Sequence, residues 1–138
     1  LAIQELTIVN EMALTIGLVM LTIGNFLGGQ WANESWGRYW GWDPKEVWAL
    51  IALLAYMAMI HGRFTGWVGT FGFPLWTTIC FSTVIMAWYG VNFVLGVGLH
   101  SYGFSSGGQA TMASFVVLQL IYCAYVTYRV KGLKWAKN

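Results

Sequence analysis

The segment from Trp31 to Trp48 concentrates the residues of this chain that could bind a large planar ligand. It reads WANESWGRYWGWDPKEVW and holds five of the nine tryptophans. Glycines alternate with aromatic residues between Trp36 and Trp42, which lets a backbone or a ring approach a flat ligand closely. Their apolar faces suit a porphyrin, and Arg38 or Lys45 could pair with its propionates. Alternatively, these aromatics form the belt common at membrane interfaces, although a belt does not explain the spacing.

The two histidines, His61 and His100, are the side chains that could ligate the iron of such a porphyrin. Histidine is a common axial ligand of haem iron, and ionisable residues inside membranes are costly and often functional. The simpler alternative for His61 is an interfacial residue beside Gly62 and Arg63. For His100 it is a polar residue with no ligand.

Helix geometry keeps these histidines apart. A helix that opens at Pro44 reaches His61 after 17 steps of ~1.5 Å, or roughly 26 Å, while His100 follows a later span on the tryptophan side. One iron cannot bind both across a bilayer core of about 30 Å. If both bind haem, two haem positions on opposite sides of a membrane imply transport. Each iron would then need a second axial ligand from outside this chain.

Composition places the elements that carry these residues in a membrane. Of the 138 residues, 58% are hydrophobic and only 9% are charged, against about 25% charged in soluble domains, and the mean hydropathy is +0.61. Backbone polar groups in lipid must be paired, so the spans should be helices. We expect an all-α polytopic membrane helix bundle, one module over residues 1–138, with a tryptophan-rich external loop. The four apolar segments are residues 7–27, 44–61, 73–96 and 110–130.

Local signals predict where these helices begin and end. Asp43 is a good N-cap, Pro44 suits the first helical position, and Glu46 can reach back to the cap. Gly28 and Gly29 are expected to close the first span. Small residues let helices approach closely in lipid, and we assign that packing role to Gly17, Gly24, Gly90 and Gly96. Cys80 and Cys123 fall within spans and are expected to act as small hydrophobes.

Basic residues predict the orientation. By the positive-inside rule, Arg63 and the C-terminal tail are cytoplasmic, whereas the tryptophan segment and His100 are external. The tail bases are Arg129, Lys131, Lys134 and Lys137. They could contact anionic lipid or be the usual stop signal of a last helix. The net charge of +2 gives no argument for nucleic acid. Because the chain begins at Leu1 rather than Met, we expect it to be the C-terminal part of a longer protein.

Residues 36–51, WGRYWGWDPKEVWALI, resemble the WWD signature of haem-handling proteins in cytochrome c biogenesis. The Asp-Pro-Lys-Glu form followed by Trp-Ala-Leu is similar to the CcsA (ResC) branch. The resemblance runs in order from about Gly24 to Gly103. Its other parts are His61-Gly62-Arg63, Gly66-Trp67, Gly90-Val91-Asn92 and Leu99-His100-Ser101-Tyr102-Gly103.

This resemblance implies a protein of a bacterial inner membrane or thylakoid that moves haem b outwards and presents it to the C-x-x-C-H motif of apocytochrome c. It implies that His61 serves an inner haem site and His100 an outer one, both as axial ligands of iron. Catalytic residues are not assigned. The haem-contacting set would be Trp36, Gly37, Arg38, Tyr39, Trp40, Trp42, Asp43, Lys45, Glu46 and Trp48.

The resemblance also implies missing parts. Proteins of this kind carry another external histidine upstream of the region matched here, and a CcsB-like subunit or fused region supplies a second transmembrane histidine. The chain would then be part of a cytochrome c haem lyase and inactive alone. Two other functions stay open: haem delivery to a chaperone, as in the CcmC branch, and a non-haem membrane transporter or structural subunit.

Overall fold

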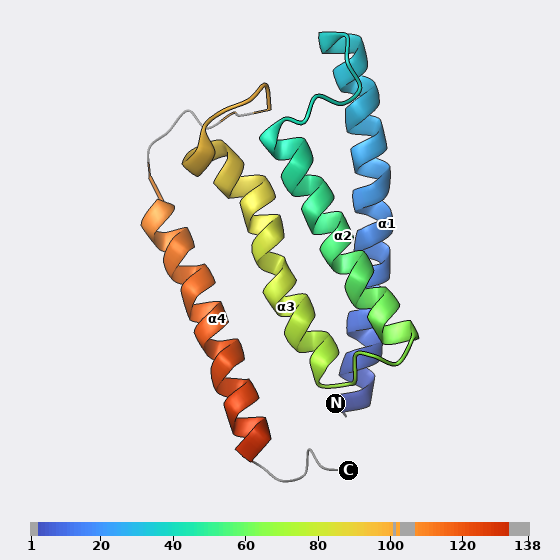
Figure 1. Ribbon diagram of the computed structural model, residues 1–138, viewed down its shortest axis with the longest axis vertical. Coiled ribbons are helices and arrows are strands. Elements are labelled where there is room, and N and C mark those ends of the chain that lie inside the picture. The colour runs from blue at the N-terminus through green and yellow to red at the C-terminus, as the bar shows by residue number, and fades with distance from the viewer. Residues whose placement is uncertain (1–2, 101, 103–106, 133–138) are drawn as a thin grey trace.

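Four antiparallel helical rods make up the computed structural model, which describes residues 3–100, 102 and 107–132 (Figure 1). The third rod changes from α-helix to π-helix part-way along. All four are long and apolar enough to cross a membrane, so the predicted all-α, four-span fold is confirmed. The elements are α1 (Ile3–Trp36), α2 (Pro44–Phe64), α3 (Gly72–Ile85), the π-helical η1 (Met86–Leu95) and α4 (Gln109–Gly132).

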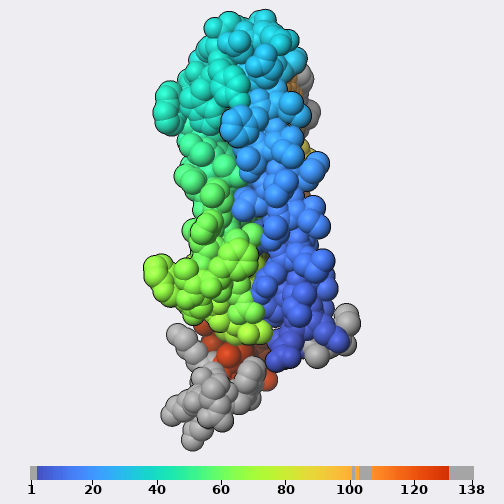
Figure 2. Space-filling view, turned by 90° about the vertical axis from the view of Figure 1, so that its right-hand side faces the viewer, coloured from blue at the N-terminus to red at the C-terminus, as the bar shows by residue number. Residues whose placement is uncertain are grey.

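The centre of the bundle is formed by α2 and the α3–η1 rod. α2 contacts α1 on one side and α3–η1 on the other, while α4 packs against α3. Phe73 and Val91 are the fully buried large side chains of this core. Figure 2 shows α1 and α2 side by side along the length of the molecule. Most large apolar side chains of α1 and α4 are exposed, as expected for helices that face lipid or other membrane helices.

Three of the four predicted spans agree closely with the helices. α2 begins at Pro44 as predicted and runs to Phe64, three residues past His61. α3 and η1 together cover residues 72–95, and α4 covers 109–132, each within two residues of its predicted limits. Cys123 is buried and Cys80 half-buried, and both are free thiols. Lys134 and Lys137 lie outside the described residues.

The predicted end of the first span is wrong. α1 continues through Gly28 and Gly29 and ends at Trp36, so it is 34 residues long. The following loop supports this extra length, because the Tyr39 hydroxyl donates to the Phe26 carbonyl oxygen at 3.1 Å. The Tyr39 ring lies where a Cβ on Gly29 would be. Tertiary contact therefore outweighs the weak helix propensity of the glycine pair. The non-helical part of the tryptophan segment is residues 37–43.

The packing role assigned to Gly96 is wrong for the described part of the chain, because this glycine ends η1 with φ of 59° and no atom lies within 4 Å of an added Cβ. The same role is also wrong for Gly17 and Gly24. A Cβ added at either position would meet no atom within 4 Å. Each glycine instead lines a cavity beside α1. The larger cavity, of about 500 Å³, lies among α1, α2 and α3.

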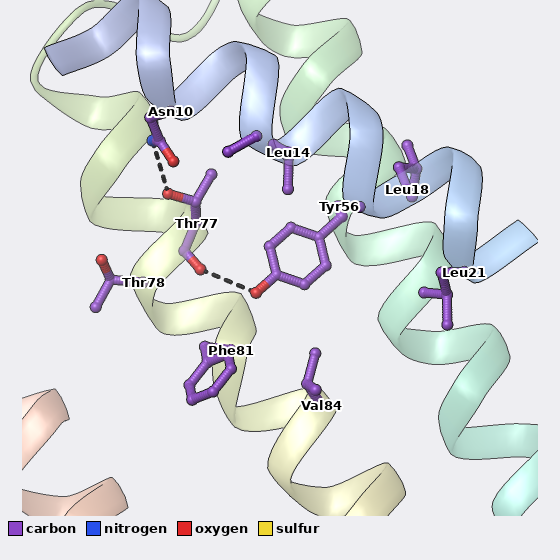
Figure 3. A pocket seen from close by; sticks show the side chains of 11 residues that line it. Asn10, Leu14, Leu18, Leu21, Tyr56, Thr77, Thr78, Phe81 and Val84 are labelled. Atoms are coloured by element: carbon purple, nitrogen blue, oxygen red, sulfur yellow. Dashed lines mark hydrogen bonds between the residues drawn. The ribbon is translucent and has the colours of Figure 1, made fainter.

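A polar link joins α1, α2 and α3 inside this apolar surrounding (Figure 3). Tyr56 projects from α2 towards the cavity, and its hydroxyl donates to the Thr77 carbonyl oxygen at 3.3 Å. Asn10 of α1 donates its amide to the Thr77 hydroxyl at 3.2 Å. Interhelical hydrogen bonds of this kind contribute on average about 0.6 kcal/mol each in a membrane, so they help to fix the register of the three helices.

An ion pair sets the register of α1 against α2. Arg63 Nε and Glu11 Oε1 are 2.5 Å apart, and each side chain is 28% exposed. Pro44 precedes Arg63 by 19 positions. Because α1 runs antiparallel to α2, the residue of α1 that lies level with Pro44 is 19 positions after Glu11, at Gln30. The last six residues of α1, 31–36, therefore extend beyond the start of α2.

Reversing one charge of this pair should destabilise the bundle. Glu11→Arg or Arg63→Glu alone places like charges together, and we expect the free energy of unfolding to fall by about 1 kcal/mol. The double reversal restores the attraction and should recover most of that loss. Thermal unfolding of the purified protein in detergent measures both. A double variant no more stable than the single variants would show that the pair does not hold α1 to α2.

Candidate functional site

A small cavity lies at the end of the bundle formed by residues 31–43, 96–100 and 102, here called the tryptophan end. Its volume is about 220 Å³, below the ~300–1,000 Å³ of pockets that enclose a whole drug-sized ligand. It would admit one part of a larger planar molecule. The lining residues are Gly24, Asn25, Gly28, Gly29 and Ala32 of α1, Tyr39 and Trp40 of the loop, Lys45, Glu46 and Ala49 of α2, and His100.

Glu46 fixes the backbone of the loop that covers this cavity. Its Oε2 accepts from the N–H groups of Gly41, at 2.8 Å, and Asp43, at 3.1 Å. Trp42 lies between these two anchors with φ of 58°, a left-handed conformation that costs a non-glycine residue ~1–2 kcal/mol. The two anchors hold Trp42 in this conformation, and the residue is 71% exposed. Its ring meets Trp40 edge to face at 5.8 Å between centroids.

Asp43 forms the predicted helix cap and also reaches the segment around His100. The capping box with Glu46 is complete, and Asp43 Oδ2 accepts from the Lys45 N–H at 3.3 Å. Oδ1 accepts from the Leu99 N–H at 2.7 Å, and Oδ2 lies 3.2 Å from His100 Nδ1. The Asp43 side chain is 2% exposed. One buried carboxylate therefore joins the start of α2 to a segment 56 residues later.

The orientation of the His100 ring follows from this contact. A carboxylate oxygen only accepts, so Nδ1 carries the proton and donates to Asp43. Nε2 is then the nitrogen that is available to a metal. Trp36 packs edge to face against the imidazole, with centroids 4.6 Å apart and an interplanar angle of 82°. Trp31 packs in turn on Trp36 at 5.0 Å.

The π-helical η1 holds the other side of the His100 segment. Its wider winding ends with a hydrogen bond from Gly96 N–H to the Val91 carbonyl oxygen, five residues back, at 3.0 Å. Asn92 Oδ1 accepts from the Tyr102 N–H at 3.1 Å, and the Tyr89 hydroxyl donates to the Gly107 carbonyl oxygen at 2.5 Å. π-Helical turns are rare in proteins, and those that occur are often found at functional sites. Asn92 stands in the Gly90-Val91-Asn92 motif without a predicted role, and the role of Tyr89 was not predicted from the sequence.

His61 lies at the opposite end of α2, as the helix geometry predicted. The 2.7 Å contact of its Nδ1 with the Met57 carbonyl oxygen requires Nδ1 to donate, which leaves Nε2 for a ligand. The exposed ring lines an apolar cavity of about 310 Å³ between α1 and α2. The two cavities adjoin overlapping faces of α1, because Thr22 lines the cavity beside His61 and Gly29, two helical turns further along, lines the cavity beside His100.

The expected haem-contacting residues separate into three groups. Tyr39, Trp40, Lys45, Glu46 and His100 come together around the cavity. Trp36 and Asp43 contact the His100 ring instead. The others do not line the cavity: Gly37 forms the turn after α1 with φ of 71°, Arg38 folds back to donate to the Gly41 carbonyl oxygen at 3.3 Å, Trp42 projects outwards, and Trp48 is half-buried on α2.

The two cations of the loop region are placed differently from one another. Lys45 lines the cavity, and its Nζ lies 5.6 Å from the centroid of the Tyr102 ring. Arg38 is engaged with its own loop, so Lys45 is the better placed to meet an anionic group in the cavity. Within residues 3–100, 102 and 107–132, no group of three or more His, Cys, Asp or Glu side chains could hold a bare metal ion. An iron held by a porphyrin and single histidines is compatible with that donor set.

Comparison with known proteins gives one consistent family. The chain matches the model described as cytochrome C assembly protein over residues 2–100. It is 50% identical over 101 residues to the protein NrfI of Wolinella succinogenes, covering 72% of this chain and 11% of NrfI. It is 46% identical over 105 residues to the cytochrome c biogenesis protein CcsA of Prochlorococcus marinus strain MIT 9515, covering 75% of this chain and 33% of that protein.

A second CcsA, from Prochlorococcus marinus strain MIT 9312, is 48% identical over the same length. The chain therefore spans about a third of the CcsA relatives and about a tenth of NrfI. The matched region contains α1, α2, α3, η1 and His100, which are the elements that build the tryptophan end. The chain belongs to the cytochrome c assembly protein family, as a membrane protein of the CcsA type.

Proposed function

We propose that this chain binds haem b at the tryptophan end and presents it to apocytochrome c for covalent attachment. The observation that carries the proposal is His100, whose ring lines the cavity while Asp43 holds its Nδ1. That arrangement leaves Nε2 for the iron. The cavity beside it is lined by Tyr39 and Trp40, which offer apolar rings to the edge of a porphyrin.

The other side chains of the tryptophan end would position haem. Lys45 supplies a cation for a propionate, and the exposed Trp42 extends the aromatic surface beyond the cavity. Because the cavity is small, most of the porphyrin would project from it. The vinyl groups would then be accessible to the two thiols of a C-x-x-C-H segment. The chain's contribution is to bind and orient haem, and bound haem supplies the chemistry of attachment.

His61 would be the axial ligand of an inner haem station, so that the chain takes part in haem export. Its free Nε2 and apolar cavity support this role. The cavities beside His61 and His100 are separate and lie towards opposite ends of α2, so passage between them would use membrane surfaces besides these two cavities. A CcsB-like subunit or fused region would provide such surfaces, together with the second axial ligand of each iron.

The proposed orientation follows the basic residues, with the tryptophan end external and Arg63 cytoplasmic. The membrane would be a bacterial inner membrane or a thylakoid. The chain would act as part of a cytochrome c haem lyase. Haem delivery to a chaperone would use the same site, and the protein that copurifies, a CcsB-like subunit or a small haem chaperone, distinguishes the two.

Replacing His100 tests the outer haem site. In the full-length protein purified from haem-replete cells, His100→Gly removes one axial ligand, so we expect loss of the bis-histidine-type visible spectrum and less bound haem. Added imidazole should occupy the space and restore the spectrum. Unchanged haem content and spectrum, with and without imidazole, would contradict the assignment. Wild-type protein with no Soret band would favour a transporter that does not bind haem.

Two substitutions of Trp42 separate its ring from its strained backbone. Trp42→Ala and Trp42→Gly both remove the ring, and we expect each to weaken haem binding roughly tenfold, equivalent to about 1.4 kcal/mol. Glycine accepts a φ of 58° freely, so the Trp42→Gly protein should be more stable than Trp42→Ala by about 1 kcal/mol. Haem titration and thermal unfolding measure the two effects. Wild-type haem affinity in both variants would exclude Trp42 as a contact.

A further inference from the structure

The Asp43 carboxylate is surrounded by donors from both sides of the tryptophan end. It accepts from the backbone N–H groups of Lys45 and Leu99 and from Nδ1 of His100. Its side chain is 2% exposed, and that of His100 is 18% exposed. A buried carboxylate with this set of partners is fixed in place, and the only ring nitrogen in the set belongs to the candidate iron ligand.

Close backbone packing makes this contact possible. Gly98 has φ of 95°, and a Cβ there would overlap the Asp43 carboxylate. Only glycine therefore lets the chain pass near enough for the next two residues to reach Asp43. On the other side of His100, Asn92 accepts from the Tyr102 N–H at 3.1 Å. Trp36 packs against the imidazole ring itself at 4.6 Å.

We propose that Asp43 is a positioning residue that controls haem iron at His100 without touching haem. This inference rests on the proposed function. The carboxylate holds the imidazole as the Nδ1–H tautomer. It also makes Nε2 a stronger electron-pair donor to iron, as carboxylates hydrogen-bonded to metal-bound histidines do. A stronger donor favours ferric over ferrous iron. Asp43 therefore lowers the reduction potential of the bound haem, and it does so from the cap position of α2.

Asp43→Asn and Asp43→Ser test the role of the carboxylate, because Asn and Ser are also good N-caps. The asparagine amide can still accept from one backbone N–H group, but neither residue offers a carboxylate to Nδ1. We expect 10–100-fold weaker haem binding and a higher reduction potential. If the affinity for ferric haem falls tenfold more than the affinity for ferrous haem, the reduction potential should rise by about 59 mV. Asp43→Ala also removes the helix cap, so it should lower the melting temperature more than Asp43→Asn or Asp43→Ser does.

The His100→Gly protein rescued with 1-methylimidazole is the matched control. The methylated nitrogen of this ligand has no N–H to donate to Asp43, so adding Asp43→Asn to that background should leave the potential unchanged. A potential that rises with Asp43→Asn in the His100 protein and stays constant in the 1-methylimidazole-rescued protein supports the inference. Gly98→Ala, which pushes Asp43 away, should raise the potential in the same direction as Asp43→Asn.

Two other outcomes overturn the inference in different ways. If His100→Gly changes the spectrum but Asp43→Asn and Asp43→Ser keep the wild-type potential, Asp43 is only a helix cap and the proposed function stands. If His100→Gly leaves haem content and spectrum unchanged, the outer site itself is wrong and the inference falls with it.

Discussion

The buried carboxylate of Asp43 is the interaction on which the tryptophan end depends. It starts α2, and through Leu99 and His100 it holds a segment that follows the third helical rod. An uncompensated buried charge would cost several kcal/mol, so burial of the Asp43 carboxylate requires its hydrogen bonds to form at the same time. The start of α2 and the orientation of His100 are thus a single structural unit.

Local signals made much of the fold predictable from sequence. Hydropathy located the helices because the absence of water in a bilayer forces backbone groups to pair within each span. The start of α2 was predicted to the residue because Asp43, Pro44 and Glu46 each satisfy a requirement of a helix N-terminus. The separation of His61 from His100 followed from helix rise together with the order of the spans. These features depend on neighbours within a few residues of one another.

Features that depend on distant contacts were not predictable in the same way. The glycine pair at 28–29 was expected to end α1, but the Tyr39 ring packs on Gly29. The Tyr39 hydroxyl also donates to the Phe26 carbonyl oxygen of the same helix. The approach of Asp43 to His100 joins residues 57 positions apart and depends on Gly98. Of the expected haem-contacting residues, five lie around one cavity: Tyr39, Trp40, Lys45, Glu46 and His100. Arg38 does not, because it folds back onto its own loop, and Trp48 lies half-buried elsewhere on α2.

The length of α1 determines the electrical surroundings of the site. At 34 residues it measures about 51 Å, well beyond the ~30 Å hydrocarbon core, and its last six residues extend beyond the start of α2. With helices of this length across the core, the charged groups Arg38, Lys45 and Glu46 would lie at the boundary of the low-dielectric layer rather than within it, whereas the buried Asp43 is compensated by its hydrogen-bond donors. Charges there lose far less hydration than in hydrocarbon. An anionic ligand could thus exchange with water at this end without a large Born penalty.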